Sequence, residues 1–180
     1  MYRTERLVMR EWTETDIDMF FEMCSDERVM KFFPSVMTYD ECVGFVERVT
    51  QRHAEDGFGL WAIEIEGVFA GFTGLARATF ATAFTPCVEV GWRLAPWAWG
   101  KGYASEAAMK SLRIGFEEHA ISEIFSFTTE TNTPSEAVMK RIGMKRRRDL
   151  DFDHPNTPGW WGQPHIVYSI DQANWAEYGG

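Results

Sequence analysis

Cysteine is scarce in this chain of 180 residues, which contains only Cys24, Cys42 and Cys87. Their number is odd and their spacing fits no metal-binding motif, which argues against a disulfide framework and against a metal site. No secretory signal precedes them, so we expect a reducing, cytoplasmic location. These absences predict a protein without a metal cofactor.

Basic residues are also few, with 18 Lys and Arg against 27 Asp and Glu and a formal net charge of −9. Nucleic-acid binding depends on Lys and Arg that neutralise phosphates, so a nucleic-acid partner is not expected. A cationic partner such as an amine fits this charge better. No apolar run approaches the ~20 residues that cross a bilayer, so no membrane partner is expected either. The length and the absence of repeats or linkers predict a single domain over residues 1–180.

Apolar periodicity predicts a mixed α/β fold. The predicted strands lie at 4–11, 60–65, 68–76, 88–94, 124–129, 145–153 and 164–171. The predicted helices lie at 13–23, 26–33, 38–55, 103–119 and 133–142. Helix starts are expected at Thr13 and Thr133, a capping box at Thr38 and Glu41, and a hairpin turn at Glu66-Gly67.

The segment Val88–Ala108 organises the chain, because alternating apolar residues lead through a turn into an Ala-rich helical pattern. The turn contains Gly100, Lys101 and Gly102. Unpaired N–H groups and the helix dipole attract phosphate at such a helix start, and glycine allows positive φ and close approach of a ligand. On this pattern alone, the turn is either a phosphate-binding loop or a tight connection.

The register of this segment sharpens the choice. Residues Gly100–Ala107, following Glu89–Leu94, resemble the acetyl-coenzyme A loop of the GNAT superfamily of N-acyltransferases. The similarity is closest to the branch of ribosomal-protein N-terminal acetyltransferases and extends over residues 3–170. Trp99 departs from the Gln or Arg at the first position of the superfamily pattern, whereas Gly102 and Ala104 match it.

The resemblance implies a mixed, mostly antiparallel seven-stranded sheet with helices on both faces and a splayed central strand pair. It also implies acetyl-coenzyme A as co-substrate and a coenzyme site made largely of main-chain groups. The expected cofactor-binding residues are Trp92, Arg93, Leu94, Trp99, Gly100, Lys101, Gly102, Tyr103, Ala104, Ser105 and Asn132. For Asn132 the alternative is a side chain that only shapes the turn into the next helix.

Acetylation of an amine needs a base for its proton and a route for the leaving thiolate. Glu89 is the candidate base, because it stands two residues before Gly91 where GNAT enzymes often place one; the alternative is an exposed carboxylate on a strand. Many of these enzymes carry a Tyr acid where this chain has Met139. Ser135 is the candidate that hydrogen-bonds the leaving sulfur, with helix capping as its alternative role.

Aromatic residues are expected near the acceptor in this family. Trp12, Phe32, Phe33 and Trp160 are the candidate substrate-binding residues, each with core or lid packing as its alternative. The resulting hypothesis is an acetyl-coenzyme A-dependent N-acetyltransferase that acts directly, in a ternary complex, on a primary amine of a protein N-terminus or a small molecule. A non-catalytic acyl-coenzyme A-binding module and a nucleotide-binding domain are the alternatives, and a homodimer is compatible with the sequence.

Overall fold

The computed structural model describes residues 1–178, and the chain divides into two compact units. Unit 1 contains residues 1–74 and 91–108, and unit 2 contains residues 75–90 and those from 109 onward. The division falls within β4 (Val68–Ala78), β5 (Cys87–Leu94) and α3 (Tyr103–Arg113), so each of these elements contributes to both units. The single-domain organisation stays a prediction.

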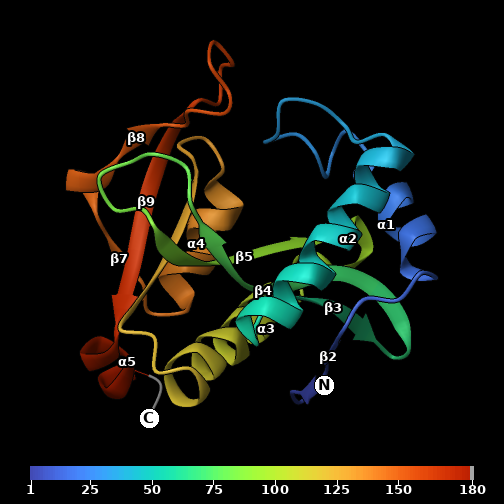
Figure 1. Cartoon of the computed structure of the whole chain (residues 1–180), viewed down its shortest axis with the longest axis horizontal. Helices are drawn as coiled ribbons and strands as arrows, with labels where there is room; N and C mark the ends of the chain where they lie inside the picture. Colours follow the sequence, from blue (N-terminus) through green and yellow to red (C-terminus); the bar gives the residue numbers. More distant parts are fainter. Residues whose placement is uncertain (179–180) are drawn as a thin grey trace. The chain divides into compact units, whose positions relative to one another are not determined.

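Unit 1 is built on antiparallel strands that include the first part of β4 (Figure 1). Met9 lies opposite Ile63, and Ala62 lies opposite Phe72. The predicted hairpin turn is confirmed, since Glu66 and Gly67 have φ values of 53° and 80°, as two-residue turns between twisted strands require. The strands that precede β4 are β1 (Tyr2–Arg3), β2 (Val8–Arg10) and β3 (Leu60–Ile65).

Two helices of unit 1, α1 (Asp16–Cys24) and α2 (Tyr39–Asp56), pack side by side in Figure 1. The predicted capping box of α2 is confirmed, because Thr38 Oγ1 accepts from the Glu41 N–H and the Glu41 carboxylate accepts from the Thr38 N–H. Gly57 ends the helix with a φ of 74°. The helix therefore begins and ends at residues whose local chemistry specifies a boundary.

The helix predicted at 26–33 is wrong, and the segment forms turns instead. Asp26 Oδ1 accepts a hydrogen bond from the Arg28 N–H at 2.8 Å. Such a bond between a short polar side chain and the backbone two residues on offers the chain an alternative to a helix.

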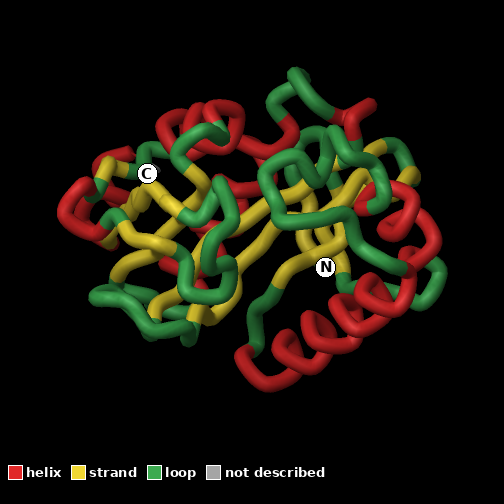
Figure 2. The backbone as a smooth tube through the Cα atoms, turned by 90° about the horizontal axis from the view of Figure 1, so that it is seen from above, coloured by secondary structure: helices red, strands yellow, loops and turns green. Residues whose placement is uncertain are grey.

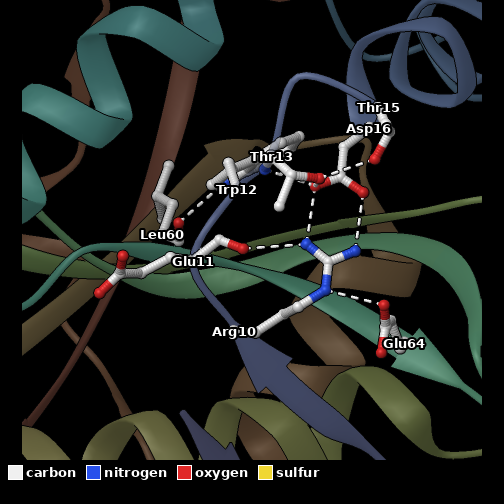
Figure 3. A network of polar contacts seen from close by, with 8 residues as sticks. All are labelled: Arg10, Glu11, Trp12, Thr13, Thr15, Asp16, Leu60 and Glu64. Atoms are coloured by element: carbon white, nitrogen blue, oxygen red, sulfur yellow. Dashed lines mark hydrogen bonds and ion pairs between the residues drawn. The ribbon is translucent and has the colours of Figure 1, made fainter.

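Arg10, at the end of β2, joins a strand and a helix of unit 1 (Figure 3). Its Nε donates to Glu64 on β3 at 2.7 Å, and its Nη1 and Nη2 donate to the Asp16 carboxylate, each at 2.7 Å. Asp16 also accepts from the N–H of Thr13. The prediction that Thr13 caps α1 is wrong, because the helix begins at Asp16, whose carboxylate holds the preceding turn.

Beyond β5 the chain passes through the short 3₁₀ helix η1 (Pro96–Ala98) into α3. Gly71 on β4 has a φ of 125°, and a Cβ there would lie 2.1 Å from the carbonyl oxygen of Arg93. Only glycine fits this close approach of the two backbones. This close approach of β4 and β5 positions the residue before η1, Ala95, whose N–H donates to the Ala70 carbonyl at 2.9 Å.

Unit 2 contains a second set of strands around β6 (Glu123–Thr129), which pairs in parallel with β5 and antiparallel with β9 (Pro164–Asp171). The β5–β6 pairing joins only Val88 to Ile124 and Glu89 to Phe125, at the first residues of both strands. This short pairing agrees with the expected splayed strand pair. In Figure 1, β7 and β8 lie one beyond the other along the same edge of the long strand β9, since β6 pairs with its other edge. The remaining elements are η2 (Ile114–Glu118), α4 (Thr133–Arg141), β7 (Lys145–Arg146), η3 (Arg148–Leu150), β8 (Phe152–Asp153) and α5 (Gln172–Tyr178).

The fold class predicted by the resemblance is confirmed as an α/β fold with a mostly antiparallel sheet, and Figure 2 shows helices together with the strands throughout the described chain. The seven predicted strand segments become nine strands within residues 1–178, because β1 (Tyr2–Arg3) lies before the segment predicted at 4–11 and the segment predicted at 145–153 is interrupted. In the interrupted segment at 145–153, Arg146 pairs with Asp151 and Arg147 with Asp149, and these ion pairs accompany a 3₁₀ turn. None of the helices within residues 1–178 is both apolar and long enough to traverse a bilayer.

Candidate functional site

The glycine turn between β5 and α3 lies in unit 1 and has the predicted backbone. Gly100 and Gly102 have φ values of 73° and 83°, a region that residues with a Cβ rarely adopt. A Cβ at Gly100 would meet no atom within 4 Å, so the space in front of it is open. Trp99 Nε1 donates to the Leu94 carbonyl at 2.7 Å and ties the turn to the end of β5. The hydrogen bond of Trp99 therefore fixes the conformation of the turn, and the side of the turn at Gly100 is open to a ligand.

The first turn of α3 follows directly at Tyr103. The N–H groups at the start of a helix have no intrahelical acceptors, and the dipole adds partial positive charge there. The Ser105 hydroxyl is buried and has no hydrogen-bond partner among the residues that the structure describes. An orphaned buried donor beside an open glycine turn fits a ligand that carries several oxygen acceptors, such as a pyrophosphate.

Arg6 reinforces this turn, although it was absent from the residues predicted from the sequence. Its Nη1 donates to the Lys101 carbonyl at 2.9 Å, and its guanidinium lies 4.6 Å from the centre of the Tyr103 ring. It also forms an ion pair with Glu106 at 2.6 Å. The contact spans 100 residues of sequence, so no local pattern could have indicated it. The exposed Lys101 adds a positive charge at the turn, whereas the charge of Arg6 is balanced by Glu106.

Glu106 anchors Arg6 from the first turn of α3. Burial acts to raise the pKa of this carboxyl, but hydrogen bonds from Thr4 Oγ1 and from the Arg6 main chain and side chain outweigh it and lower the pKa below its ordinary value. Glu106 is therefore ionised at neutral pH and is fully occupied by its partners. Its role is structural support of the turn.

Glu89, the predicted base, lies in unit 2 near the start of β5 and is half-buried opposite Phe125. Cys87 precedes it on the same strand. Burial, followed by the charges of Glu89 and Glu123, raises the pKa of the Cys87 thiol to about 12. A thiol that stays protonated at neutral pH is a poor nucleophile, which supports direct transfer over a covalent cysteine intermediate.

Asn132, Ser135 and Met139 belong to the start and the buried face of α4 in unit 2. Asn132, rather than the predicted Thr133, is the N-cap residue, and its Oδ1 accepts from the Ser135 N–H at 3.3 Å. Its Nδ2 donates to Thr128 Oγ1 at 2.9 Å, so both ends of its amide are occupied. These contacts support the alternative, turn-shaping role of Asn132. Met139 is 1% exposed and belongs to the core.

The predicted substrate-binding aromatics have different surroundings. Trp12 is 8% exposed, its ring packs against Phe20 at 5.1 Å, and its Nε1 donates to the Leu60 carbonyl, all of which supports core packing. Phe32 is half-buried, whereas Phe33 is 38% exposed. The structure thus separates one buried ring from a ring that reaches the surface of unit 1.

Trp160 lies in unit 2 and is half-buried between its neighbours along the chain. Its ring centre is 5.1 Å from that of the exposed Trp161, and a Cβ at Gly162 would lie 2.3 Å from its ring. These contacts support local packing of the loop that leads into β9.

Arg93 was predicted to bind coenzyme through its main chain, and the structure also gives its side chain an unusual environment in unit 1. Its Nη1 lies 3.3 Å from Cys24 Sγ and 3.4 Å from Met37 Sδ. Its guanidinium carbon is 4.1 Å from the centre of the Phe33 ring and 5.4 Å from that of Phe72. Its neighbours on strand β5, Trp92 and Leu94, are half-buried and buried respectively.

Unit 2 also contains an open depression of about 560 Å³ near the start of β5 and β6. Its lining includes Phe84, Phe125, Cys87 and the ion pair Arg147–Glu123, and none of the predicted site residues. Within residues 1–178, no group of three or more His, Cys, Asp and Glu side chains is arranged to hold a metal ion.

Comparison with known proteins identifies similar acetyltransferases. A family model described as an acetyltransferase (GNAT) domain matches residues 6–145. YnaD of Bacillus subtilis strain 168, described as an uncharacterised N-acetyltransferase, is 31% identical over 175 residues, which cover 96% of this chain and 97% of that protein.

Solved structures agree. The crystal structure of a GNAT-family acetyltransferase from Bacillus anthracis has a TM-score of 0.78 and 29% identity, and the match covers 95% of this chain and 98% of the other. RimL, a ribosomal L7/L12 alpha-N-protein acetyltransferase solved with coenzyme A, has a TM-score of 0.75 over 93% of this chain and 95% of its own. At 15% identity, the likeness to RimL is one of fold.

Proposed function

We propose that this chain, which belongs to the GNAT acetyltransferase family, transfers an acetyl group from acetyl-coenzyme A to a primary amine by direct attack. The family membership establishes the reaction class and the acetyl donor. The amine and the roles of individual residues are our proposal. The amine belongs either to a protein N-terminus, as the resemblance to the ribosomal-protein branch suggests, or to a small molecule.

The observation that carries the proposal is the turn at 99–105. Two glycines with positive φ, an open space at Gly100 and a buried orphan hydroxyl at Ser105 together form a cradle for acceptor oxygens. Lys101 adds positive charge to it, and Arg6 supports its backbone by donating to the Lys101 carbonyl. We assign the pyrophosphate of acetyl-coenzyme A to this cradle, because main-chain donors at a helix start bind phosphate oxygens.

The reaction requires three changes of bonding. The amine nitrogen attacks the thioester carbonyl carbon and forms the carbon–nitrogen bond, Glu89 takes a proton from that nitrogen, and the carbon–sulfur bond breaks with departure of the coenzyme thiolate. We assign the oxyanion donor to the Trp92 N–H, since one such donor is worth about 3 kcal/mol of transition-state stabilisation. A thiol with a pKa of about 8–9 can leave as the thiolate, with the Ser135 hydroxyl as its hydrogen-bond donor.

The test is release of free coenzyme thiol from acetyl-coenzyme A in the presence of a panel of amines. The panel contains short peptides with free N-termini, polyamines, amino sugars and amino acids. At least one class is expected to accelerate thiol release in the wild type. The variant Glu89→Gln, which keeps the shape but removes the base, is expected to lower kcat by about 10²–10⁴-fold.

A non-catalytic acyl-coenzyme A-binding module predicts a different result, in which acetyl-coenzyme A binds but no amine releases thiol in either form. A nucleotide-binding domain predicts tighter calorimetric binding of ATP than of coenzyme A. Amine-dependent release that Glu89→Gln leaves unchanged would remove Glu89 from the mechanism and retain the transferase.

A further inference from the structure

Arg93 has a guanidinium that the described protein leaves largely unsatisfied. Its only hydrogen-bond acceptors within residues 1–178 are two sulfur atoms, and both contact the same nitrogen, Nη1. Sulfur is a weak acceptor compared with a carboxylate oxygen. Its Nε is buried and has no partner among the described residues.

Neither sulfur supplies a counter-charge. Burial raises the pKa of Cys24 above its ordinary value even though Arg93 acts in the opposite direction, so this thiol is neutral at pH 7. Burial likewise raises the pKa of the neighbouring Cys42 to about 11. Met37 carries no charge at any pH. Arg93 is half-buried, and a partly buried cation without a counter-ion is unfavourable, which makes the site receptive to an anion from outside the chain.

The geometry indicates which anion. Because both sulfurs contact Nη1, the remaining edge of the guanidinium, formed by Nε and Nη2, is the one without an acceptor from the described residues. Two parallel N–H groups along one edge match the two oxygens of a carboxylate. Elsewhere in unit 1, Arg6 uses this same edge for the Glu106 carboxylate, although there Nε at 2.7 Å and Nη2 at 2.6 Å both contact one oxygen, Oε2.

Phe33 and Phe72 contact the faces of the same guanidinium, and Phe33 is 38% exposed. Stacking on aromatic rings holds the plane of the guanidinium and leaves its edges for hydrogen bonds. Since Phe33 is 38% exposed, the ring that covers this face of the guanidinium can turn aside with little loss of core packing. The pair forms an anion site with an aromatic cover.

We propose that Arg93 binds a carboxylate of the acceptor, so that the preferred substrate is an amine that also carries a carboxylate, such as an amino acid or an acidic peptide. This inference rests on the proposed function, because it names the substrate class for the same transfer. It assigns to the Arg93 side chain a specificity role distinct from any main-chain contact to coenzyme.

The first experiment uses the wild type and needs no variant. Thiol release is measured for matched pairs of amines, an amino acid or peptide bearing a free carboxylate and the same compound with that carboxylate converted to an amide. The carboxylate form is expected to have a kcat/KM about 10- to 100-fold higher, as a charge-assisted pair of hydrogen bonds provides. Equal kcat/KM values, or a preference for the amide, overturn the inference and leave the proposed function intact.

The second experiment compares variants. In Arg93→Gln the ratio of kcat/KM between the carboxylate and the amide is expected to fall close to 1, and Arg93→Lys retains part of it because charge remains without the two-pronged edge. Arg28→Gln is the matched control, since it removes a positive charge from unit 1 at an exposed ion pair with Asp26, and the ratio should stay at the wild-type value. An unchanged ratio in Arg93→Gln contradicts the inference.

Failure of the proposed function gives a distinguishable result. If no amine in the panel releases thiol, calorimetric titration of the wild type with the carboxylate, its amide and inorganic phosphate still tests Arg93. Binding of the carboxylate alone, lost in Arg93→Gln and kept in Arg28→Gln, supports the site. Binding of phosphate in preference to the carboxylate, or of none of the three, overturns it.

Discussion

Two arginines of unit 1, Arg10 and Arg93, show how the same side chain takes different roles. Arg10 uses three nitrogens on two carboxylates and a carbonyl, from Asp16, Glu64 and Glu11 (Figure 3). Arg93 contacts two sulfurs and two aromatic rings, and no carboxylate within residues 1–178 accepts from it. The Arg10 guanidinium has oxygen acceptors within the protein for all three of its nitrogens, whereas the Arg93 guanidinium keeps two N–H groups along one edge for a ligand.

The difference separates structural from ligand-binding charge. Although burial acts to raise the pKa of Asp16, the hydrogen bonds from Arg10 and Thr13 lower it, and the bond to Asp16 in turn raises the pKa of Arg10. Both groups therefore remain charged and paired over the physiological range. A charge held in this way stabilises the fold and has nothing left for a substrate.

The largest expected effect comes from removing Arg10. Arg10→Met leaves the Asp16 carboxylate buried without its positively charged partner, because the side chain of Asp16 is only 3% exposed and its remaining donors are the main chain and hydroxyl of Thr13. Loss of one partner of a buried pair costs about 3–5 kcal/mol, and we expect about 3 kcal/mol here because Arg10 is partly exposed. Urea denaturation measures the free energy of unfolding.

Arg93→Met is the contrasting variant and is expected to change the free energy of unfolding by less than about 1 kcal/mol, since it removes an uncompensated charge and keeps the apolar contacts. If Arg93→Met destabilises the protein as much as Arg10→Met does, both arginines are structural and the comparison fails.

Acid sensitivity is the next expected effect. The pKa of Asp16 is lower in the folded protein than its ordinary value of 3.8, so its ionised form stabilises the fold above about pH 4, and this contribution is lost as the pH falls below that value. Asp16→Asn should therefore flatten the decline of the free energy of unfolding between about pH 4 and pH 2. The measurement is urea denaturation across that range, with Glu5→Gln, at an exposed carboxylate of unit 1, as the control.

Two glycines extend the comparison from side chains to turns. Gly100 and Gly67 have φ values of 73° and 80°, and a Cβ at either would meet nothing within 4 Å. Alanine at each is expected to cost about 1 kcal/mol of stability from the backbone strain alone.

Only Gly100→Ala should also weaken the binding of acetyl-coenzyme A, by about 10-fold in calorimetry, because its Cβ would occupy the proposed phosphate cradle. Equal coenzyme affinity in the two variants would argue that the turn is a simple connection.

The smallest expected effect concerns the aromatic cover of Arg93. Phe33→Leu removes the ring 4.1 Å from the guanidinium and should cost about 0.5 kcal/mol of stability. It should also reduce the preference for the carboxylate-bearing amine by a few-fold in the thiol-release assay. Phe32→Leu is the neighbouring control. If Phe32→Leu reduces the preference for the carboxylate-bearing amine more than Phe33→Leu does, the assignment of Phe33 as the ring that covers the acceptor site is wrong.

Local patterns predicted the parts of the fold whose causes lie within a few residues. The capping box at Thr38 and the hairpin at Glu66-Gly67 are both present as expected. The glycine turn at 100–102 also has its predicted positive φ values. Each feature depends on backbone preferences and on hydrogen bonds between near neighbours, which the order of residues states directly.

The errors lie where distant residues or competing local bonds decide. The helix expected at 26–33 loses to turns supported by the Asp26 side chain, and α1 begins at Asp16 because Arg10 holds that carboxylate. The cap of α4 is Asn132, whose amide also reaches back to Thr128 on β6. In each case a polar side chain forms a hydrogen bond that the periodicity of apolar residues does not predict.

The sequence by itself determined the family, the α/β class and the turn that is suited to phosphate, because these depend on residue order over short spans. Only the tertiary structure decided which charged side chains are paired within the protein and which still have donors for a ligand. It brought Arg6 to a turn about 100 residues away, paired Arg10 with two carboxylates, and surrounded Arg93 with sulfur and aromatic rings. Whether an arginine guanidinium supports the fold or can bind a ligand depends on the residues that surround it in space. Which residues surround it is decided by the hydrophobic packing of the whole unit.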